Sequence, residues 1–314
     1  MSKRKTLDSF FRPPEVKKQR VEGSEEKSIH PTYPFPIPHL PQHIVDRLNF
    51  GPDQEGKAIN DRPDLDLMYF QPYIAKDIEK ELFEFLRREL FFYRVRYTIK
   101  RGTLETQVNT PRFTTVFGVD DTSRFLDDGS LIDAQTRKPV PQDRYKCTPR
   151  PIPQCLDVLR AITEGSTGCS FNFCLVNYYA SGNDSISYHS DDERFLGPLP
   201  AIASFSLGAK RDFLMKHKPN PPSTTNTSVT DVEPLKLSLA SGDMILMKGK
   251  TQSCWLHSIP KRRGGEADRG RINITFRKAL VKGGTENYYQ YNVGSSQPYR
   301  WDNQCNEMRP WKPS

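Results

Sequence analysis

Arg271-Ile-Asn-Ile-Thr-Phe-Arg277 is a stretch in which polar and apolar side chains alternate strictly. Successive side chains of a β-strand point to opposite faces of the sheet. The alternation therefore predicts a strand with a polar row on one face and Ile272, Ile274 and Phe276 on the other. Taken alone, the polar row fits either the lining of a pocket or the solvent face of an edge strand.

Other short apolar segments fill the second half of the chain, and turn-forming residues separate most of them. Two helices are predicted before them, over residues 75–90 and through residues 156–162, where apolar residues recur at helical spacing. This order predicts an α+β fold, a double-stranded β-helix (jelly-roll) core with a helical buttress. The candidate strands are residues 171–179, 186–189, 203–207, 213–217, 235–239, 244–247, 255–258 and 271–276.

The two ends of the chain differ from this core in composition. Residues 1–60 lack apolar periodicity and include the proline-rich run 31–41, so we expect a disordered tail and linker, with ordered structure beginning near Leu65. The main folded domain is expected over residues 61–283. Residues 284–314 form an aromatic-rich C-terminal extension, which we expect to pack against the barrel.

The overall composition indicates a basic protein with a polyanionic partner. The 314 residues carry a net charge of +8, with a pI of 9.1 and a mean hydropathy of −0.69. A basic surface favours nucleic acid, although it also serves solubility. The six cysteines form no Cys-x-x-Cys pair, and the sequence shows neither a secretory segment nor an apolar run of membrane-spanning length. We therefore expect a monomeric intracellular protein with reduced thiols.

His189-Ser190-Asp191 and the later His257 are candidate metal ligands. His189 and Asp191 share one face of a predicted strand, and His257 lies on another strand. Two histidines and one carboxylate can hold a divalent iron ion on one side and leave its other positions open. A lone histidine is more often a hydrogen-bonded structural residue, and His-x-Asp by itself is a weak signal.

Beside such a triad, the polar row is better explained as the lining of a pocket. Arg271 or Arg277 could pair with the distal carboxylate of a dicarboxylic cosubstrate, and the other could support its metal-bound end. Asn177 and Tyr179 share a face of the 171–179 strand and would offer an amide and a phenol to the same pocket.

Several motifs occur together in an order that resembles one known family. They are Phe171-Asn-Phe-Cys-Leu-Val-Asn-Tyr-Tyr179, His189-Ser-Asp-Asp-Glu193, Ser206-Leu-Gly-Ala-Lys-Arg-Asp-Phe213 and Arg271-x-Asn-x-x-x-Arg277. The sequence from about residue 65 to residue 280 resembles the AlkB family of iron(II)/2-oxoglutarate dioxygenases. The resemblance is closest to the eukaryotic nuclear members that repair alkylated nucleic acid.

The resemblance implies a reaction and a set of ligands. His189, Asp191 and His257 would bind Fe(II), with 2-oxoglutarate and O2 as cosubstrates. The residues that would hold 2-oxoglutarate are Asn177, Tyr179, Arg271, Thr275 and Arg277. The implied activity is oxidative demethylation of 1-methyladenine and 3-methylcytosine in DNA. The alternatives are an RNA or protein demethylase or hydroxylase of the same fold, and a catalytically silent module that binds nucleic acid.

The resemblance also points to substrate contacts. Asp192 and Glu193, directly after the metal-binding aspartate, would favour a cationic methylated base, although a solvated acidic turn explains them as well. Tyr145 is the candidate stacking platform, and Phe117 is either a base contact or a core aromatic residue. The basic residues that could follow phosphates are Lys210, Arg211, Lys216, His217, Lys218, Lys248, Lys250, Lys261, Arg262 and Arg263.

The N-terminal tail carries two further signals. Leu7, Phe10 and Phe11 resemble the anchors of a peptide that binds the sliding clamp PCNA, with Arg4 in place of the usual leading glutamine. Basic clusters at residues 3–5 and 17–20 are spaced like a bipartite nuclear import signal. Together they predict a nuclear protein that contacts the replication clamp.

Overall fold

The computed structural model describes residues 26–145, 147–219, 232–280 and 297–313. Its centre is a seven-stranded antiparallel sheet, the major sheet, in the order β3-β4-β15-β12-β17-β10-β7. These strands span Lys57–Ile59 (β3), Leu67–Phe70 (β4), Met244–Met247 (β15), Ile202–Gly208 (β12), Arg271–Arg277 (β17), Phe173–Tyr179 (β10) and Phe113–Gly118 (β7).

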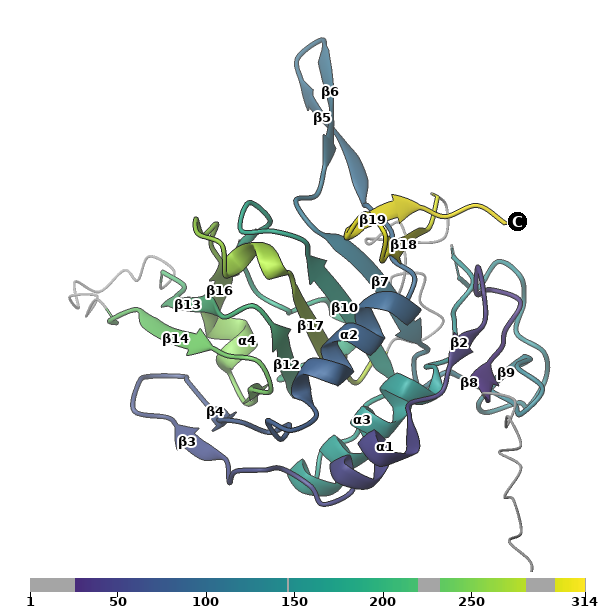
Figure 1. The fold of residues 1–314 in the computed structure, drawn as a ribbon, viewed down its shortest axis with the longest axis horizontal. Helices are drawn as coiled ribbons and strands as arrows, with labels where there is room; N and C mark the ends of the chain where they lie inside the picture. Colours follow the sequence, from purple (N-terminus) through teal and green to yellow (C-terminus); the bar gives the residue numbers. More distant parts are fainter. Residues whose placement is uncertain (1–25, 146, 220–231, 281–296, 314) are drawn as a thin grey trace, which may run out of the picture.

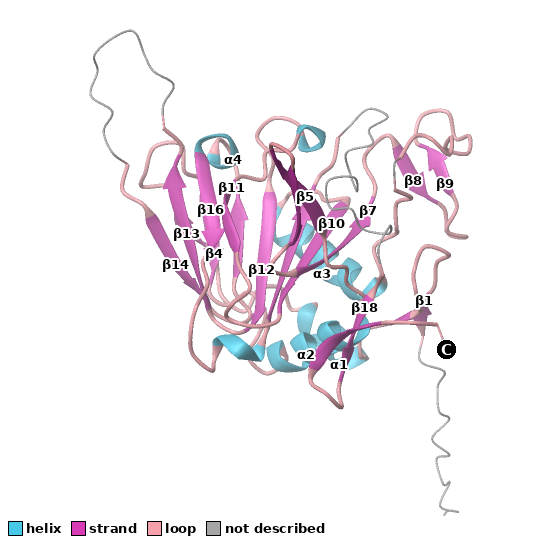
Figure 2. Cartoon of the chain, turned by 90° about the horizontal axis from the view of Figure 1, so that it is seen from above, coloured by secondary structure: helices cyan, strands magenta, loops and turns pink. Residues whose placement is uncertain are grey.

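A second antiparallel sheet, the minor sheet, has the order β11-β16-β13-β14. Figure 2 shows its strands at the left of the molecule, with the helices α1, α2 and α3 to the right. The two sheets together form the expected double-stranded β-helix, which confirms the predicted fold class. The minor strands span Ile186–His189 (β11), Trp255–Ile259 (β16), Arg211–His217 (β13) and Leu235–Leu239 (β14).

The helices form the buttress. Figure 1 shows α2 lying across the major sheet, where it contacts β12. The predicted helix over 75–90 begins later, at Glu79, because residues 75–78 form a turn instead. The helices are α1 (Gln42–Leu48), α2 (Glu79–Glu89), α3 (Gln154–Thr167) and the single-turn α4 (Thr251–Cys254), with 3-10 turns at Arg194–Leu196 and Ala267–Arg269.

Several small two-stranded hairpins lie outside the two main sheets, and most of them were not predicted. The β5–β6 hairpin projects from the body of the molecule, as Figure 1 shows. No helix in the described part of the chain has the length and apolar character needed to cross a membrane. The remaining strands are β1 (Lys27–Ser28), β2 (Ile37–Pro38), β5 (Arg96–Arg101), β6 (Leu104–Asn109), β8 (Ser123–Phe125), β9 (Leu131–Asp133), β18 (Tyr299–Asp302) and β19 (Glu307–Pro310).

The prediction that residues up to 60 form a disordered tail is wrong from residue 26 onward. The 31–41 run forms no helix, as its prolines require, but passes through a turn and bends into the short strand β2, and its Tyr33, Phe35 and Ile37 are all buried. Burying an aromatic or aliphatic side chain contributes about 1.5–3 kcal/mol each, which offsets the entropy of ordering this segment. The next residues form α1, whose Ile44 is fully buried.

The C-terminal hairpin packs beside this N-terminal segment and α2. The rings of Phe35 and Trp311 lie 5.2 Å apart, and the Arg300 guanidinium lies 4.5 Å above the Phe35 ring. The guanidinium of Arg87, on α2, stacks 4.0 Å from the Trp301 ring. The two ends of the described chain are therefore joined to each other as well as to the core. The expectation was packing against the barrel, and the rings of Tyr299 and Trp301 do lie against Phe113 and Tyr178 of the major sheet.

Candidate metal and cosubstrate site

A pocket lies between the two sheets, and β17 supplies its floor. The polar row of this strand faces the pocket, whereas Ile272, Ile274 and Phe276 are fully buried in the core. On β10, Tyr178 points away from the pocket and packs against Phe92 and Trp301. The candidate residues that line the pocket are Asn177, Tyr179, His189, Asp191, Glu193, His257, Arg271, Thr275 and Arg277.

The three candidate metal ligands meet at one end of this pocket. β11 and β16 pair so that His189 lies directly opposite His257, and their ring centroids are 4.3 Å apart. The Nε2 atoms of both rings lie 3.8 Å from the Asp191 carboxylate, each from a different oxygen. One ligand atom from each residue can therefore converge within 4.8 Å, which is the spacing of a shared cation. Two imidazoles and a carboxylate on one side of an ion form the donor set of non-haem iron(II) oxygenases.

The state of each histidine suits metal binding. The Nδ1 of His189 lies 2.8 Å from the Ser187 carbonyl, so this nitrogen carries the proton and Nε2 presents its lone pair. The ring of His257 stacks on Phe213. Burial, together with the neighbouring His189 and Arg277, lowers the pKa of His257 well below its usual value. The Nε2 atoms of the two rings are thus directed at the same carboxylate.

This depressed pKa predicts a pH effect on the metal-free protein. As the pH falls below about 6.5, the unfolded chain takes up a proton at His257 that the folded chain refuses. We therefore expect the free energy of unfolding to decrease on acidification through this range. Urea unfolding of metal-free protein between pH 7.5 and 5.5 measures the slope, which His257→Gln should reduce. Gln304→Leu, at an exposed side chain that does not titrate, should leave it unaltered; equal slopes in all three proteins would contradict the assignment.

Gln252 supports the metal-binding turn from behind, and sequence reasoning missed it. It lies on α4, is almost fully buried, and its side-chain oxygen accepts the backbone N–H of Asp191 at 2.8 Å. Its side-chain nitrogen lies 3.1 Å from the sulfur of Met247. The Gln252 amide therefore fixes the position of Asp191 without itself being one of the candidate metal ligands.

Replacing this support should weaken metal binding. In Gln252→Leu the Asp191 N–H loses its acceptor, and we expect about 10- to 100-fold lower affinity for iron(II). Anaerobic titration of metal-free protein with iron(II) measures the loss. Gln304→Leu, at an exposed position far along the chain, is the matched control. Wild-type affinity in Gln252→Leu would show that the turn holds its shape without the amide.

Arg271 lies at the other end of the pocket and has bonding capacity to spare. It is 1 % exposed, and its Nη2 donates to the hydroxyl of Ser206 at 2.8 Å. Its Nε and Nη1 are buried and have no hydrogen-bond partner among the described residues. Burial lowers its pKa to about 10, so the guanidinium remains charged at neutral pH. A buried cation with two unsatisfied donors is a site for a carboxylate.

Arg277 plays a different part. Its Nη2 lies 3.0 Å from Asp191, and its Nη1 lies 3.3 Å from Glu193. All three side chains are wholly or largely buried. The arginine therefore holds the metal-ligand carboxylate and the next acidic side chain in place, rather than standing ready for a ligand of its own.

The Asn177 amide is oriented by residues that were not predicted. Its oxygen accepts the Arg112 Nε at 3.2 Å and the Thr114 hydroxyl at 2.8 Å. Because the Arg112 Nε can only donate, the amide oxygen must face β7 and the NH2 remains available to the pocket. The hydroxyl of Thr275 donates to the Leu175 carbonyl. Arg112 is a lone arginine just before the strand β7, and nothing in the sequence indicated that it would reach Asn177.

The two acidic candidates after Asp191 differ in position. Glu193 lines the pocket and pairs with Arg277, whereas Asp192 lies outside its lining and pairs with Lys218 at 3.0 Å. Lys218 helps to hold the pKa of the Asp192 carboxyl below its ordinary value, against the effect of partial burial. Both remain near the metal end of the pocket because they follow Asp191 in the chain.

Neither aromatic candidate lies in the pocket. Phe117 is fully buried, and its ring packs against the rings of Tyr33 and Phe91, so its role is in the core. Tyr145 is buried, with its hydroxyl 2.8 Å from Asp120 and 3.0 Å from Ser123. Burial raises the pKa of this phenol to about 12. A buried ring cannot serve as a stacking platform in this conformation.

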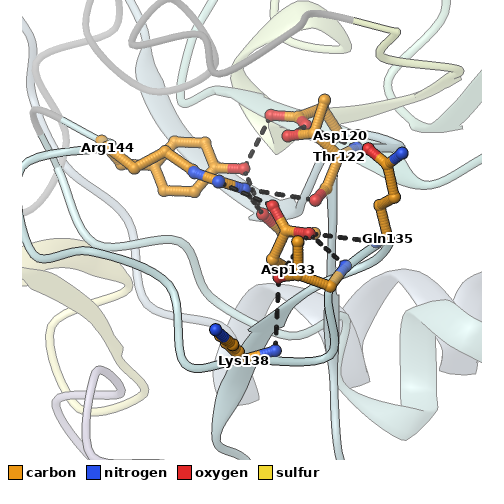
Figure 3. Close-up of polar contacts among 9 residues, drawn as sticks. Asp120, Thr122, Asp133, Gln135, Lys138 and Arg144 are labelled. Carbon is orange, nitrogen blue, oxygen red and sulfur yellow. Dashed lines mark hydrogen bonds and ion pairs between the residues drawn. The ribbon is translucent and has the colours of Figure 1, made fainter.

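Tyr145 belongs instead to a polar network around the β8–β9 hairpin. Figure 3 shows Arg144 reaching Asp133, at 2.7 Å, and Thr122 beside Asp120. Asp133 also accepts the backbone N–H groups of Gln135 and Thr136. The segment around Tyr145, the candidate stacking platform, is therefore held in this loop by its polar contacts.

Two of the basic residues expected to follow phosphates have other roles. Arg211 is fully buried and donates to the carbonyls of Asp184 and Pro260. His217 is largely buried beside Asp64. In contrast, Lys210, Lys261 and Arg262 are exposed and line one shared surface depression. Leu7, Phe10 and Phe11 lie outside the described residues.

Comparison with known proteins places this geometry among related chains. Residues 66–277 match the model of the 2OG-Fe(II) oxygenase superfamily, which is more than half of the chain. The human alpha-ketoglutarate-dependent dioxygenase alkB homolog 3 is 40% identical over 141 residues, covering 44% of this chain and 48% of that protein. The human DNA oxidative demethylase ALKBH2 is 41% identical over 134 residues, covering 43% and 49%.

The same range of similarity extends to a plant protein. The Arabidopsis thaliana DNA oxidative demethylase ALKBH2 is 39% identical over 141 residues, covering 41% of this chain and 44% of that protein. The chain thus spans less than half the length of these curated relatives. The solved structure of OsALKBH1 is 19% identical, covers 71% of this chain and 100% of its own, and superimposes with a TM-score of 0.38.

Proposed function

This chain belongs to the AlkB family of the 2OG-Fe(II) oxygenase superfamily, and from that premise we propose that it oxidatively demethylates N-alkylated bases in DNA. The family implies Fe(II) and 2-oxoglutarate, with O2 as the second cosubstrate. The proposed lesions are 1-methyladenine and 3-methylcytosine, and the proposed biological role is direct reversal of alkylation damage.

One observation carries the enzymatic part of the proposal. The buried Arg271 guanidinium, with two unsatisfied nitrogens, opens into the same pocket as the His189, Asp191 and His257 ligand atoms. Burying the Arg271 guanidinium without a partner costs roughly several kcal/mol. A protein that bound only a metal ion would have no use for it, whereas a dicarboxylate cosubstrate would pair with it. The residues present therefore fit both an iron(II) ion and 2-oxoglutarate.

The chain's own residues divide the remaining work. When bound, iron(II) and 2-oxoglutarate supply the activation of O2 that hydroxylates an N-methyl group, after which the product loses formaldehyde. His189, Asp191 and His257 would hold the iron(II) ion at one end of the pocket. Phe213 covers the His257 ring and excludes water from that side. Arg277 holds the Asp191 carboxylate in position through its Nη2, 3.0 Å away.

Charge and similarity support the choice of substrate. Relatives named DNA oxidative demethylase share about 40% identity with the core of this chain. Methylation gives 1-methyladenine and 3-methylcytosine a positive charge, and a carboxylate such as Glu193 in the pocket lining would favour them over neutral bases. A base must leave its stack to reach an enclosed pocket, so a flipped or single-stranded base is required. The exposed Lys210, Lys261 and Arg262 are suited to the phosphates of that strand.

The test is formaldehyde release from matched oligonucleotides. Single-stranded DNA, duplex DNA and RNA of one sequence, each with a single 1-methyladenine or 3-methylcytosine, are incubated with iron(II) and 2-oxoglutarate. We expect formaldehyde and succinate in equal amounts from a DNA substrate, and none when iron(II) or 2-oxoglutarate is left out. Unmethylated oligonucleotides are the matched control.

The outcomes separate the enzyme class from its substrate. Release from RNA but not DNA would overturn the proposed substrate and retain the reaction. Decarboxylation of 2-oxoglutarate without release from any methylated nucleic acid would point to protein or another substrate. Absence of both reactions would leave a binding module and contradict the proposal as a whole.

We further propose that the protein acts in the nucleus and contacts a PCNA-type sliding clamp through its N-terminal tail. The support is the spacing of Leu7, Phe10 and Phe11 and the adjacent basic clusters. Fluorescence anisotropy of a peptide covering residues 1–25 measures clamp binding, with a Leu7, Phe10 and Phe11 triple-alanine peptide as control. Equal binding of both peptides would exclude this motif.

A further inference from the structure

A second group of potential metal ligands lies outside the catalytic pocket. It consists of Asp64, His217 and Cys254, which we call the outer cluster. One carboxylate oxygen, one imidazole nitrogen and the thiol sulfur lie within 4.8 Å of one another. The three residues come from the loop before β4, the last residue of β13 and the last residue of α4. None of them lines the catalytic pocket.

Backbone and side-chain bonds hold these three segments together. The Trp255 indole donates to the Pro63 carbonyl at 3.0 Å, and the Thr251 hydroxyl accepts the Asp66 N–H at 2.9 Å. The Lys218 N–H donates to the Cys254 carbonyl at 2.7 Å. Asp64 itself has a φ of 56°, in the left-handed region that costs energy for a residue with a side chain. The loop is thus held in a shape that turns its carboxylate toward the other two ligands.

His217 is poised as a ligand through one nitrogen. Its Nδ1 lies 2.7 Å from the Lys218 carbonyl, so Nδ1 carries the proton and Nε2 presents the lone pair. Nε2 is buried and has no hydrogen-bond partner among the described residues. Its distance to the nearer Asp64 oxygen, 3.6 Å, exceeds that of a hydrogen bond. A buried lone pair without a donor costs free energy, and a cation at this point would satisfy it.

Two simpler explanations of the outer cluster fail on geometry. A Cys-His-Asp catalytic triad needs one imidazole nitrogen for the thiol and the other for the carboxylate, but Nδ1 of His217 is committed to a carbonyl. A plain ion pair accounts for only part of Asp64. Lys250 lies 3.2 Å from Oδ1 and holds the pKa of this carboxyl below its usual value, whereas Oδ2 faces His217.

We propose that Asp64, His217 and Cys254 bind a zinc-class divalent cation, with water completing a four-coordinate site. A thiolate, an imidazole and a carboxylate are the donors that zinc takes in proteins, and the sulfur distinguishes this set from the catalytic triad. On binding, the Cys254 S–H bond breaks, its electron pair forms the metal–sulfur bond, and the proton passes to solvent. No oxidant or reductant is involved.

Such a cation would act as a structural tie beside the catalytic centre. It would join the β4 loop, β13 and α4, and α4 also carries Gln252, which holds Asp191. Lys218, next to His217, bridges the carboxylate of Asp192 and the carbonyl of Gln252 at 3.0 and 3.2 Å. The outer cluster therefore lies directly behind the turn that carries the catalytic metal ligands.

Cobalt(II) provides a direct test, because a thiolate ligand adds a charge-transfer absorption that histidine and carboxylate ligands do not give. The full chain is stripped of metal and titrated with cobalt(II) without oxygen. We expect the thiolate band in the wild type and in Asp191→Ala, and its loss in Cys254→Ser. Cys169→Ser, at another half-buried cysteine, is the matched control and should keep the band.

Bound zinc supplies the second measurement. After dialysis against zinc(II), the wild type should retain one equivalent more than Cys254→Ser. If Cys254→Ser does not fold, Asp64→Asn replaces it, because this partly exposed side chain can change without opening the core; at least about 10-fold weaker cobalt binding is expected. A wild type without a thiolate band, a band that survives Cys254→Ser, or unchanged affinity in folded Asp64→Asn would each overturn the proposal. All these readouts are independent of demethylation.

Discussion

Asp191→Ala is expected to abolish oxidative demethylation, with a fall in rate of at least about 1000-fold, or ~4 kcal/mol of transition-state stabilisation. Asp191 supplies both carboxylate oxygens between the two histidines, and no other described carboxylate joins that ligand group. Without it, two imidazoles alone must hold the iron. Bound iron and formaldehyde release, measured on the same sample, test this expectation.

The loss must be separated from a loss of folding. Removing Asp191 leaves Arg277 without its partner at 3.0 Å, and breaking a buried ion pair costs about 3–5 kcal/mol. His189→Gln removes a metal ligand that is partly exposed and outside this ion pair, so it should lose activity with less effect on stability. Asp212→Ala is the control that should stay active. This carboxylate, on β13, pairs with Lys236 of β14. Substantial activity in both ligand variants would rule out the proposed metal site.

Arg271→Gln should raise the KM for 2-oxoglutarate by about 100-fold, because truncating one side of a buried charge pair costs about 2–5 kcal/mol. The glutamine can keep one hydrogen bond but not the charge or the two-pronged geometry. Initial rates across a range of 2-oxoglutarate concentrations, at saturating iron(II), give the value. Affinity for iron(II) should stay within a few-fold of the wild type.

Two further variants refine this result. Arg271→Lys retains the charge, and we expect partial recovery of the KM because an ammonium cannot pair in two prongs. Arg269→Gln, on the exposed 3-10 turn two residues earlier, should leave the KM unaltered. An unchanged KM in Arg271→Gln would show that the unsatisfied nitrogens of Arg271 do not meet the cosubstrate.

The sequence predicted the strands that form the pocket because their chemistry is periodic. In β17 the alternation of polar and apolar residues corresponds to the two faces of a strand between a pocket and a core. The expected strand over 186–189 has the same bounds in the structure, and the register of β11 against β16 then sets His189 opposite His257. A two-residue repeat is visible in one sequence, so the strands and their faces could be predicted locally, whereas the pairing of His189 with His257 is a distant contact that only the structure shows.

What the sequence could not provide depends on contacts between segments far apart in the chain. Arg112 reaches Asn177 across 65 positions, and Gln252 reaches Asp191 across 61. Nothing local distinguishes these residues from solvated polar side chains. The same holds for Tyr145, the candidate stacking platform: its position in the sequence gave no sign that Asp120 and Ser123 would hold its hydroxyl in a buried network.

The N-terminal segment shows a different limit of sequence reasoning. Prolines exclude helix and central strand, which led to the expectation of an unpacked linker through residue 60. They do not exclude burial, because a turn or bend can still place an apolar side chain against the core. Tyr33 and Phe35 enter the core from a bend that follows a turn, and Ile37 enters it from the short strand β2.

The contact between Phe35 and Trp311 has a consequence for anything attached to the chain ends. Residues from the beginning and the end of the described chain are anchored at one place, so a cargo fused to either end is tethered from the same side of the molecule. A tag or label placed at either end of the described chain would therefore sit beside the other end, and a substitution at Phe35 or Trp311 would loosen both attachments together without touching the pocket.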